Sequence, residues 1–136
     1  MKGEKFFVFL VICTMFLFTA CSKPTTIILF NNAPITKDNF LNNATEFFAG
    51  KKIYYLFITE KKLDTEFIRV RVLKRNEKVD YEITGLAYSN DFRLYKNQIY
   101  YYNDYIVINE AGYYCMVIYT KNRLTTPLVT ANFRVK

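Results

Sequence analysis

Histidine and tryptophan are absent from this 136-residue sequence, and glycine, proline and cysteine are scarce. Without histidine, most of the acid–base and nucleophilic arrangements that enzymes use cannot be built. Three cysteines and no histidine also exclude metal sites made from Cys and His clusters. Four glycines and three prolines interrupt the chain rarely, so regular secondary structure should dominate. We therefore expect neither catalysis, nor a bound metal, nor a cofactor.

The N-terminal segment has the layout of a secretory signal peptide. Lys2 and Lys5 form a positively charged start, an apolar run follows over 6–18, and small residues precede Cys21. The sequence of 18–21, Phe-Thr-Ala-Cys, resembles the lipobox of the bacterial lipoprotein family, in which leucine is usual at the first position. This resemblance implies that lipid is attached to the thiol of Cys21 and that the chain is cut just before it.

This interpretation divides the chain into a signal peptide over 1–20, expected to be helical, a lipidated cysteine with a short linker over 21–26, and one domain over 27–136. Two other interpretations remain open, an ordinary secretory signal and an uncut membrane anchor. The apolar stretch 6–20 is shorter than the ~20 residues that a membrane-spanning helix needs. A lipoprotein would belong to the cell envelope, at the outer membrane or at the periplasmic face of the inner membrane.

The charge balance is basic, with 19 Lys and Arg against 12 Asp and Glu, a net charge of +7. Loss of Lys2, Lys5 and Glu4 with the signal peptide lowers this to +6. Such a charge favours anionic partners without choosing among them, and a solvated basic surface is the simpler explanation. No nucleic-acid binding is expected. Cys115 would have no intramolecular disulfide partner once Cys13 is removed and Cys21 is lipidated.

The chain after residue 50 carries the period-two and β-branched or aromatic patterns of β-strands. In 67–74, for example, Ile68, Val70 and Val72 share one face, while Arg69 and Arg71 share the other. Val129, Ala131, Phe133 and Val135 should point inward from the last strand. Turn signals separate the segments, including one at 89–91. The strands expected on these grounds are 25–30, 51–59, 67–74, 79–84, 86–88, 92–95, 98–108, 113–120 and 128–135.

One segment is ambiguous between helix and loop. Within 36–48, the apolar residues recur at helical spacing and Thr36 is suited to cap a helix start. A short helix is one interpretation, and a loop with strand-like ends is the other. Parallel α/β architecture is excluded in practice, because no helices lie between the strands.

The most informative internal motif is 109–115, which reads NEAGYYC. It resembles the immunoglobulin-type signature Asp-x-Ala-x-Tyr-Tyr-Cys, with Asn in place of Asp. The resemblance implies that Tyr113 forms a tyrosine corner and that Cys115 faces inward on the next-to-last strand. The tryptophan and the inter-sheet disulfide of true immunoglobulin domains are missing. The prediction is an all-β, immunoglobulin-like antiparallel β-sandwich of about seven to eight strands, and other β topologies remain open.

Two sets of residues are candidates for a binding surface. Arg69 and Arg71 share a strand face that could meet an anionic glycan or lipid, although such arginines also keep a sheet surface soluble. Tyr100, Tyr101 and Tyr102 are consecutive in a predicted strand, so some of these rings should be exposed. Exposed tyrosines are common in recognition surfaces, and they are also ordinary sheet residues.

The expected function is therefore that of a non-catalytic lipoprotein, held to a membrane by lipid on Cys21. It would bind an envelope or surface protein, or contribute to envelope assembly. The alternative is a lipoprotein that recognises an anionic glycan or lipid through the basic strand face. Fold by itself does not choose between them.

Overall fold

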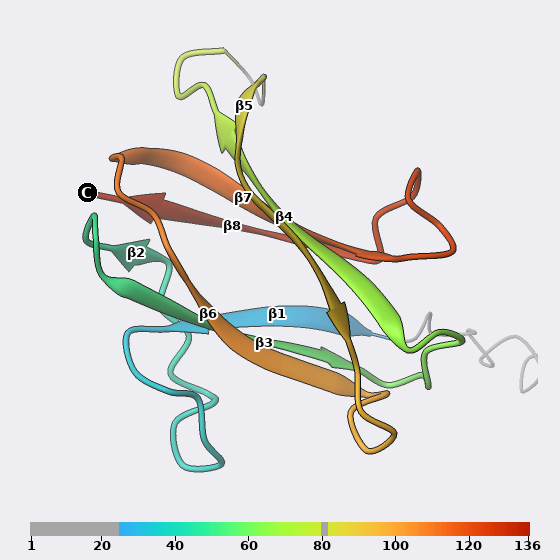
Figure 1. Ribbon diagram of the computed structural model, residues 1–136. Helices are drawn as coiled ribbons and strands as arrows, with labels where there is room; N and C mark the ends of the chain where they lie inside the picture. The colour runs from blue at the N-terminus through green and yellow to red at the C-terminus, as the bar shows by residue number, and fades with distance from the viewer. Residues whose placement is uncertain (1–24, 80–81) are drawn as a thin grey trace, which may run out of the picture.

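The computed structural model describes residues 25–79 and 82–136, and it arranges them as two packed β-sheets (Figure 1). The predicted signal helix and Cys21 lie outside the described residues. The smaller sheet has the strand order β1-β3-β6 and is antiparallel throughout. The larger sheet has the order β2-β8-β7-β4-β5, and only the short β2 runs parallel to its neighbour. The strands are β1 (Thr26–Asn31), β2 (Glu46–Phe47), β3 (Lys52–Thr59), β4 (Phe67–Arg75), β5 (Ile83–Arg93), β6 (Tyr101–Val107), β7 (Gly112–Thr120) and β8 (Val129–Val135).

The core lies between the two sheets and is built from alternate residues of each strand. Ile68, Val70 and Val72 are fully buried, as their alternation in the sequence predicts. Phe133 and Val135 are buried on β8, and Val129 and Ala131 pack against the same core, so the predicted inward face of the last strand is confirmed.

Aromatic rings fill the space at the centre of the core. The ring centroids of Phe30 and Phe133 lie 5.1 Å apart, and Tyr114 stacks on Phe133 at 5.6 Å. Phe47, from the two-residue strand β2, meets Phe30 edge-on at 6.2 Å. Each such ring buries a large apolar area, which is the main favourable term in folding. These contacts join both sheets without a disulfide or a tryptophan.

The predicted strands 79–84, 86–88 and 92–95, with a turn at 89–91, are wrong in detail. One continuous strand, β5, runs along β4 through this region, and Asp91 lies opposite Arg69. Residues 89–91 are polar and resemble a turn in the sequence. They are held in the strand by backbone pairing with β4 and by the ion pair between Asp91 and Arg69. Two bulges, at Val72/Leu73 and Lys74/Arg75, accommodate the extra residues of β5.

The helix considered for 36–48 does not form, and the alternative of a loop with a strand-like end describes this segment. A single turn is closed by hydrogen bonds from the amides of Asn39 and Phe40 to the carbonyl of Thr36. The chain then turns back to β1, where the Ala44 amide donates to the Phe30 carbonyl at 2.8 Å. Long-range backbone pairing therefore overrides the helical spacing of the apolar residues.

The connections gather at the two ends of the sandwich. One end, the N-proximal end, holds Thr25 and the connections 60–66, 94–100 and 121–128. The other, the distal end, holds the connections 32–45, 48–51 and 108–111, the described part of the connection between β4 and β5, and the C-terminus. In Figure 1 the N-proximal end lies to the right and the C-terminus to the left.

Candidate interaction surfaces

The outer face of the β1-β3-β6 sheet, here called the apolar face, is not covered by another strand of the described chain. Pairing in register places residues of the three strands side by side, with Leu29 and Asn103 flanking Leu56. Eight of its eleven side chains are apolar or aromatic, which departs from the usual polar outer face of an antiparallel sheet. The apolar face consists of Ile27, Leu29, Asn31, Lys52, Tyr54, Leu56, Ile58, Tyr101, Asn103, Tyr105 and Val107.

The apolar face carries very little charge. Lys52 is its single ionisable residue apart from tyrosines, and the Lys52 Nζ lies 4.2 Å from the centroid of the Tyr105 ring. Tyr54 and Tyr105 face each other across the strands, with centroids 5.8 Å apart. Tyr105 and Val107 are each 43% exposed. Depletion of charge together with tyrosine enrichment is the compositional signature of a protein-interface core.

The three consecutive tyrosines predicted as one candidate surface separate into three environments. Tyr100 is exposed but precedes β6, in a turn where the Tyr101 amide donates to the Gln98 carbonyl at 3.1 Å. Tyr101 belongs to the apolar face. Tyr102 points to the interior, where its ring lies 4.9 Å from that of Phe92. Tyr101 is therefore the one member of this set that shares a surface with Tyr54 and Tyr105.

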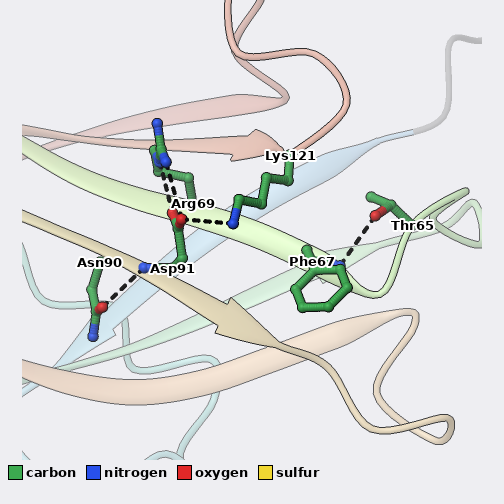
Figure 2. A network of polar contacts seen from close by, with 6 residues as sticks. All are labelled: Thr65, Phe67, Arg69, Asn90, Asp91 and Lys121. Atoms are coloured by element: carbon green, nitrogen blue, oxygen red, sulfur yellow. Dashed lines mark hydrogen bonds and ion pairs between the residues drawn. The ribbon is translucent and has the colours of Figure 1, made fainter.

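The predicted basic strand face lies on the outer side of the larger sheet, where its first arginine is already neutralised. Asp91 accepts two hydrogen bonds from Arg69, at 2.6 and 3.0 Å. It also pairs with Lys121, whose Nζ lies 3.1 Å away (Figure 2). These hydrogen bonds, the one from Arg69 above all, hold the pKa of Asp91 far below its ordinary value. Arg69 therefore faces a carboxylate rather than an open anion site.

Arg71 is engaged in a different way. Its guanidinium carbon lies 5.6 Å from the centroid of the Tyr119 ring, in a cation–π arrangement. Its Nε is buried, and no described residue accepts a hydrogen bond from it. The opposing residue on β7 is Val117, which is only 3% exposed although it is on the outer side of the sheet. The Arg71 and Tyr119 side chains thus pack against each other, and little of the outer side of the sheet at Val117 is left exposed.

The tyrosine corner exists, but Tyr114 forms it, and the assignment to Tyr113 is wrong. The Tyr114 hydroxyl donates to the backbone carbonyl of Glu110 at 2.7 Å, and its ring is 1% exposed. Tyr113 points outward, where the Arg134 guanidinium lies 5.1 Å from its ring centroid. Between Ala111 and the corner tyrosine there is one residue more than in the signature, so the inward register is shifted by one.

The same shift corrects the prediction for Cys115. Met116, two residues after Tyr114, is fully buried, whereas Cys115 is half-buried on the outer side of β7 opposite Leu73. Burial raises the pKa of the Cys115 thiol, so that little thiolate forms at neutral pH. Cys115 is a free cysteine in the described structure.

A small polar cluster lies inside the sandwich beside β6. The Tyr102 hydroxyl donates to an Asp104 carboxylate oxygen at 3.0 Å. The Tyr55 hydroxyl is buried, and no described residue pairs with it. Burial raises the pKa of both Tyr55 and Tyr102 well above the ordinary value for tyrosine. Both phenols therefore stay protonated at neutral pH.

The described residues offer shallow hollows rather than a deep cleft. One of them has a volume of about 540 Å³, and one of the two acids that line it, Glu46, pairs with Lys136 and Arg134. Another, of about 500 Å³, lies over Cys115 and Val117. In residues 25–79 and 82–136, no three Cys, Asp or Glu side chains lie close enough to hold a metal ion. No helix in those residues is long and apolar enough to cross a membrane.

Comparison with known proteins assigns the fold and goes no further. No protein-family model and no curated protein sequence matches the chain. The PmoD soluble domain of Methylocystis sp. ATCC 49242 (Rockwell) has a similar structure, with a TM-score of 0.53 and 12% sequence identity. The alignment covers 85% of this chain and 94% of that domain.

An immunoglobulin-like protein from Pseudomonas aeruginosa is also similar, with a TM-score of 0.50 and 12% identity over 86% of this chain and 99% of the other. The protein therefore has an immunoglobulin-like β-sandwich, as its sequence motif predicts. At this level of identity the likeness concerns the fold alone.

Sequence reasoning missed most of the apolar face, because its members come from three strands that are distant in the chain. The sequence does contain one sign of this face, in 51–59, where apolar and aromatic residues occupy both faces of one strand. Taken alone, that pattern is typical of a central strand covered on both faces. The structure shows that β3 is central in its sheet but half-exposed along Tyr54, Leu56 and Ile58.

Proposed function

We propose that this protein is a lipid-anchored, non-catalytic binding module of the bacterial cell envelope, and that it binds another envelope protein through the apolar face. The observation that carries the proposal is an outer sheet face with eight apolar or aromatic side chains and one cation. Burial of such a surface against a partner is favourable in proportion to the apolar area removed from water.

The anchor is the lipid on Cys21 that the lipobox-like sequence 18–21 implies. Two or more acyl chains hold a protein stably at a membrane. A tether of four residues separates Cys21 from the start of β1 at Thr26. The folded sandwich would therefore stay close to the membrane that carries the lipid, and its partner would be another component of the envelope.

A different protein fits the apolar face better than a second copy of this chain. Three strands at a spacing of ~4.8 Å and about six residues at ~3.3 Å give a face of roughly 14 by 20 Å. Two such faces would bury roughly 600 Å², which is below the ~1,000 Å² expected of a specific interface. A partner that covers the apolar face and also reaches exposed Lys51, which adjoins Lys52, would bury more. We therefore infer a partner with an apolar patch bordered by carboxylates.

The absence of catalysis is part of the proposal. The acids Glu46, Glu66, Asp91 and Glu110 are each engaged in an ion pair, which favours a structural role for them. The alternative function, anionic glycan or lipid binding through Arg69 and Arg71, has less support. Asp91 neutralises Arg69, and Arg71 packs against Tyr119.

Site-specific photo-crosslinking in the native cells tests the proposal. A photoreactive amino acid at Tyr54 or at Tyr105 should give one discrete protein adduct, the same from both positions. The same amino acid at Leu86, which is 59% exposed on edge strand β5, is the matched control and should not give it. Adducts with lipid alone, adducts of twice the chain mass, or identical adducts from all three positions would contradict the proposal.

Binding to the purified partner then provides the quantitative step. Leu56→Asp and Tyr105→Asp place a charge within the apolar face and should each weaken binding at least about tenfold, or ~1.4 kcal/mol. Leu86→Asp makes the same kind of change elsewhere and should leave binding unchanged. A partner that binds all three variants equally does not use this face.

A further inference from the structure

The two ends of the sandwich differ in charge and in their exposed side chains. The N-proximal connections 60–66, 94–100 and 121–128 contain five basic and three acidic residues. The described residues of the distal connections contain three basic and four acidic ones. The basic residues of the N-proximal end are all exposed, and they are Lys61, Lys62, Lys96, Lys121 and Arg123.

Two of the N-proximal connections, 60–66 and 94–100, are bonded to each other, and the first of them is bonded to the start of the described chain. Thr25 and Glu60 exchange two hydrogen bonds, from the Glu60 amide to the Thr25 carbonyl at 3.2 Å and from the Thr25 amide to the Glu60 Oε2 at 3.0 Å. The Leu63 amide donates to the Ile99 carbonyl at 3.1 Å. Lys61 and Lys62 are therefore held beside the point at which the tether enters the fold.

Exposed tyrosines accompany these lysines. Tyr95 is 75% exposed and Tyr100 is 46% exposed, and both lie in the connection that contains Lys96. Tyrosine places an apolar ring and a polar hydroxyl at the level of lipid headgroups, and lysine is attracted to anionic lipids there. The large apolar residues exposed in the described distal connections are instead Phe40, Leu41, Phe48 and Val79, which have no polar end. The N-proximal end has one such residue, Leu124.

We propose that the N-proximal end rests on anionic lipid headgroups, so that the sandwich stands with its strands along the membrane normal. This inference rests on the proposed lipid at Cys21, which fixes the distance available. The four residues between Cys21 and Thr26 make five Cα–Cα steps, which span at most about 17 Å, so the connection that contains Lys61 and Lys62 reaches the headgroup layer. The apolar face then stands beside the membrane rather than on it, and it remains open to a protein partner.

Fluorescence quenching by brominated lipids tests this orientation. The chain contains no tryptophan, so one tryptophan introduced by substitution is a unique reporter. The purified lipidated protein is reconstituted in phosphatidylcholine vesicles, with and without phosphatidylglycerol, as three variants: Tyr100→Trp at the N-proximal end, Tyr54→Trp on the apolar face and Leu41→Trp at the distal end. On anionic vesicles we expect strong quenching for Tyr100→Trp, weak quenching for Tyr54→Trp and none for Leu41→Trp.

Charge reversal and added salt distinguish two causes of quenching. One is binding to anionic lipid, and the other is the closeness to the membrane that the tether alone imposes. Lys61→Glu with Lys62→Glu should reduce quenching of the Tyr100→Trp variant on anionic vesicles and leave it unchanged on neutral ones. Lys78→Glu at the distal end is the control. Raising salt from about 0.1 M to about 1 M shortens the screening length from ~10 Å to ~3 Å and should have the same effect as the reversal.

Each contrary outcome overturns the orientation in a recognisable way. Equal quenching of Tyr54→Trp and Tyr100→Trp would mean that the apolar face lies on the bilayer. No quenching of Tyr100→Trp in a protein whose intact mass shows the lipid would mean that the tether holds the domain away. A chain without lipid would contradict the anchor itself, and the orientation would fail with it.

Discussion

The two outer faces of the sandwich differ in whether their side chains have partners within the protein. On the five-stranded sheet, Arg69, Asp91 and Lys121 satisfy one another, and Arg71 packs on Tyr119. On the three-stranded sheet, apolar and aromatic residues are left half-exposed with one lysine among them. A face whose charged groups largely pair with one another gains little from a further surface, whereas an apolar face gains free energy when another surface covers it.

Matched aspartate substitutions on the two faces should sharpen this contrast most. Val117→Asp would place a charge where the native side chain is 3% exposed, and we expect it to lower the free energy of unfolding by about 3 kcal/mol or more. Leu56→Asp lies on the half-exposed apolar face and should lower it by only about 1 kcal/mol. Urea unfolding measures both losses. Equal losses would mean that the apolar face is part of the structural core.

A second pair of variants compares the inward and outward sides of β7. Tyr114→Phe removes the hydrogen bond to the Glu110 carbonyl and should cost about 1 kcal/mol of unfolding free energy. Tyr113→Phe should leave the free energy of unfolding nearly unchanged, because its outward hydroxyl bonds the Glu77 side chain at the surface. The same denaturant titration distinguishes them. A larger loss for Tyr113→Phe would restore the register that the sequence motif implied.

Loss of the ion pairs of the charged face should lower the free energy of unfolding by a small amount that depends on pH. Because the folded-state pKa of Asp91 lies below its unfolded value, its stabilisation is complete above about pH 4 and is lost as pH falls through the folded pKa. Asp91→Asn should therefore be less stable than the native protein at pH 7, by less than Tyr114→Phe, and the difference should narrow below pH 4.

Thermal unfolding across this pH range provides the measurement for Asp91→Asn, and Asp64→Asn in the exposed connection 60–66 is the control. A difference between native protein and Asp91→Asn that stays constant from pH 7 to pH 3 would show that the carboxylate of Asp91 is not held by Arg69 and Lys121.

The sequence predicted the fold class because alternation and burial follow the same period in strands such as β4 and β8. It also located the motif near Tyr113 and Tyr114, but not which ring faces inward. A one-residue shift exchanges the two faces of a strand, and only contacts with Phe133 and Glu110 fix it. The ion pair of Arg69 with Asp91 likewise could not be predicted from the sequence, because 22 residues separate the partners.

The apolar face shows why a site of this kind resists prediction from sequence. Leu29, Leu56 and Asn103 become neighbours only through the pairing of β1, β3 and β6. An apolar run such as 51–59 is compatible with burial on both faces until the number of layers is known. The consecutive tyrosines were a clearer signal in the sequence, but strand geometry sends Tyr101 and Tyr102 to opposite faces.

Both the proposed binding function and the proposed orientation depend on the lipid at Cys21, so its detection is the most direct test. The measurement is the intact mass and detergent partitioning of the native protein beside a Cys21→Ala variant. The account predicts a chain that begins at Cys21, carries a lipid-sized mass increase and partitions into detergent, with the lipid lost in the variant. A native product without lipid that remains in the aqueous phase would contradict the central claim.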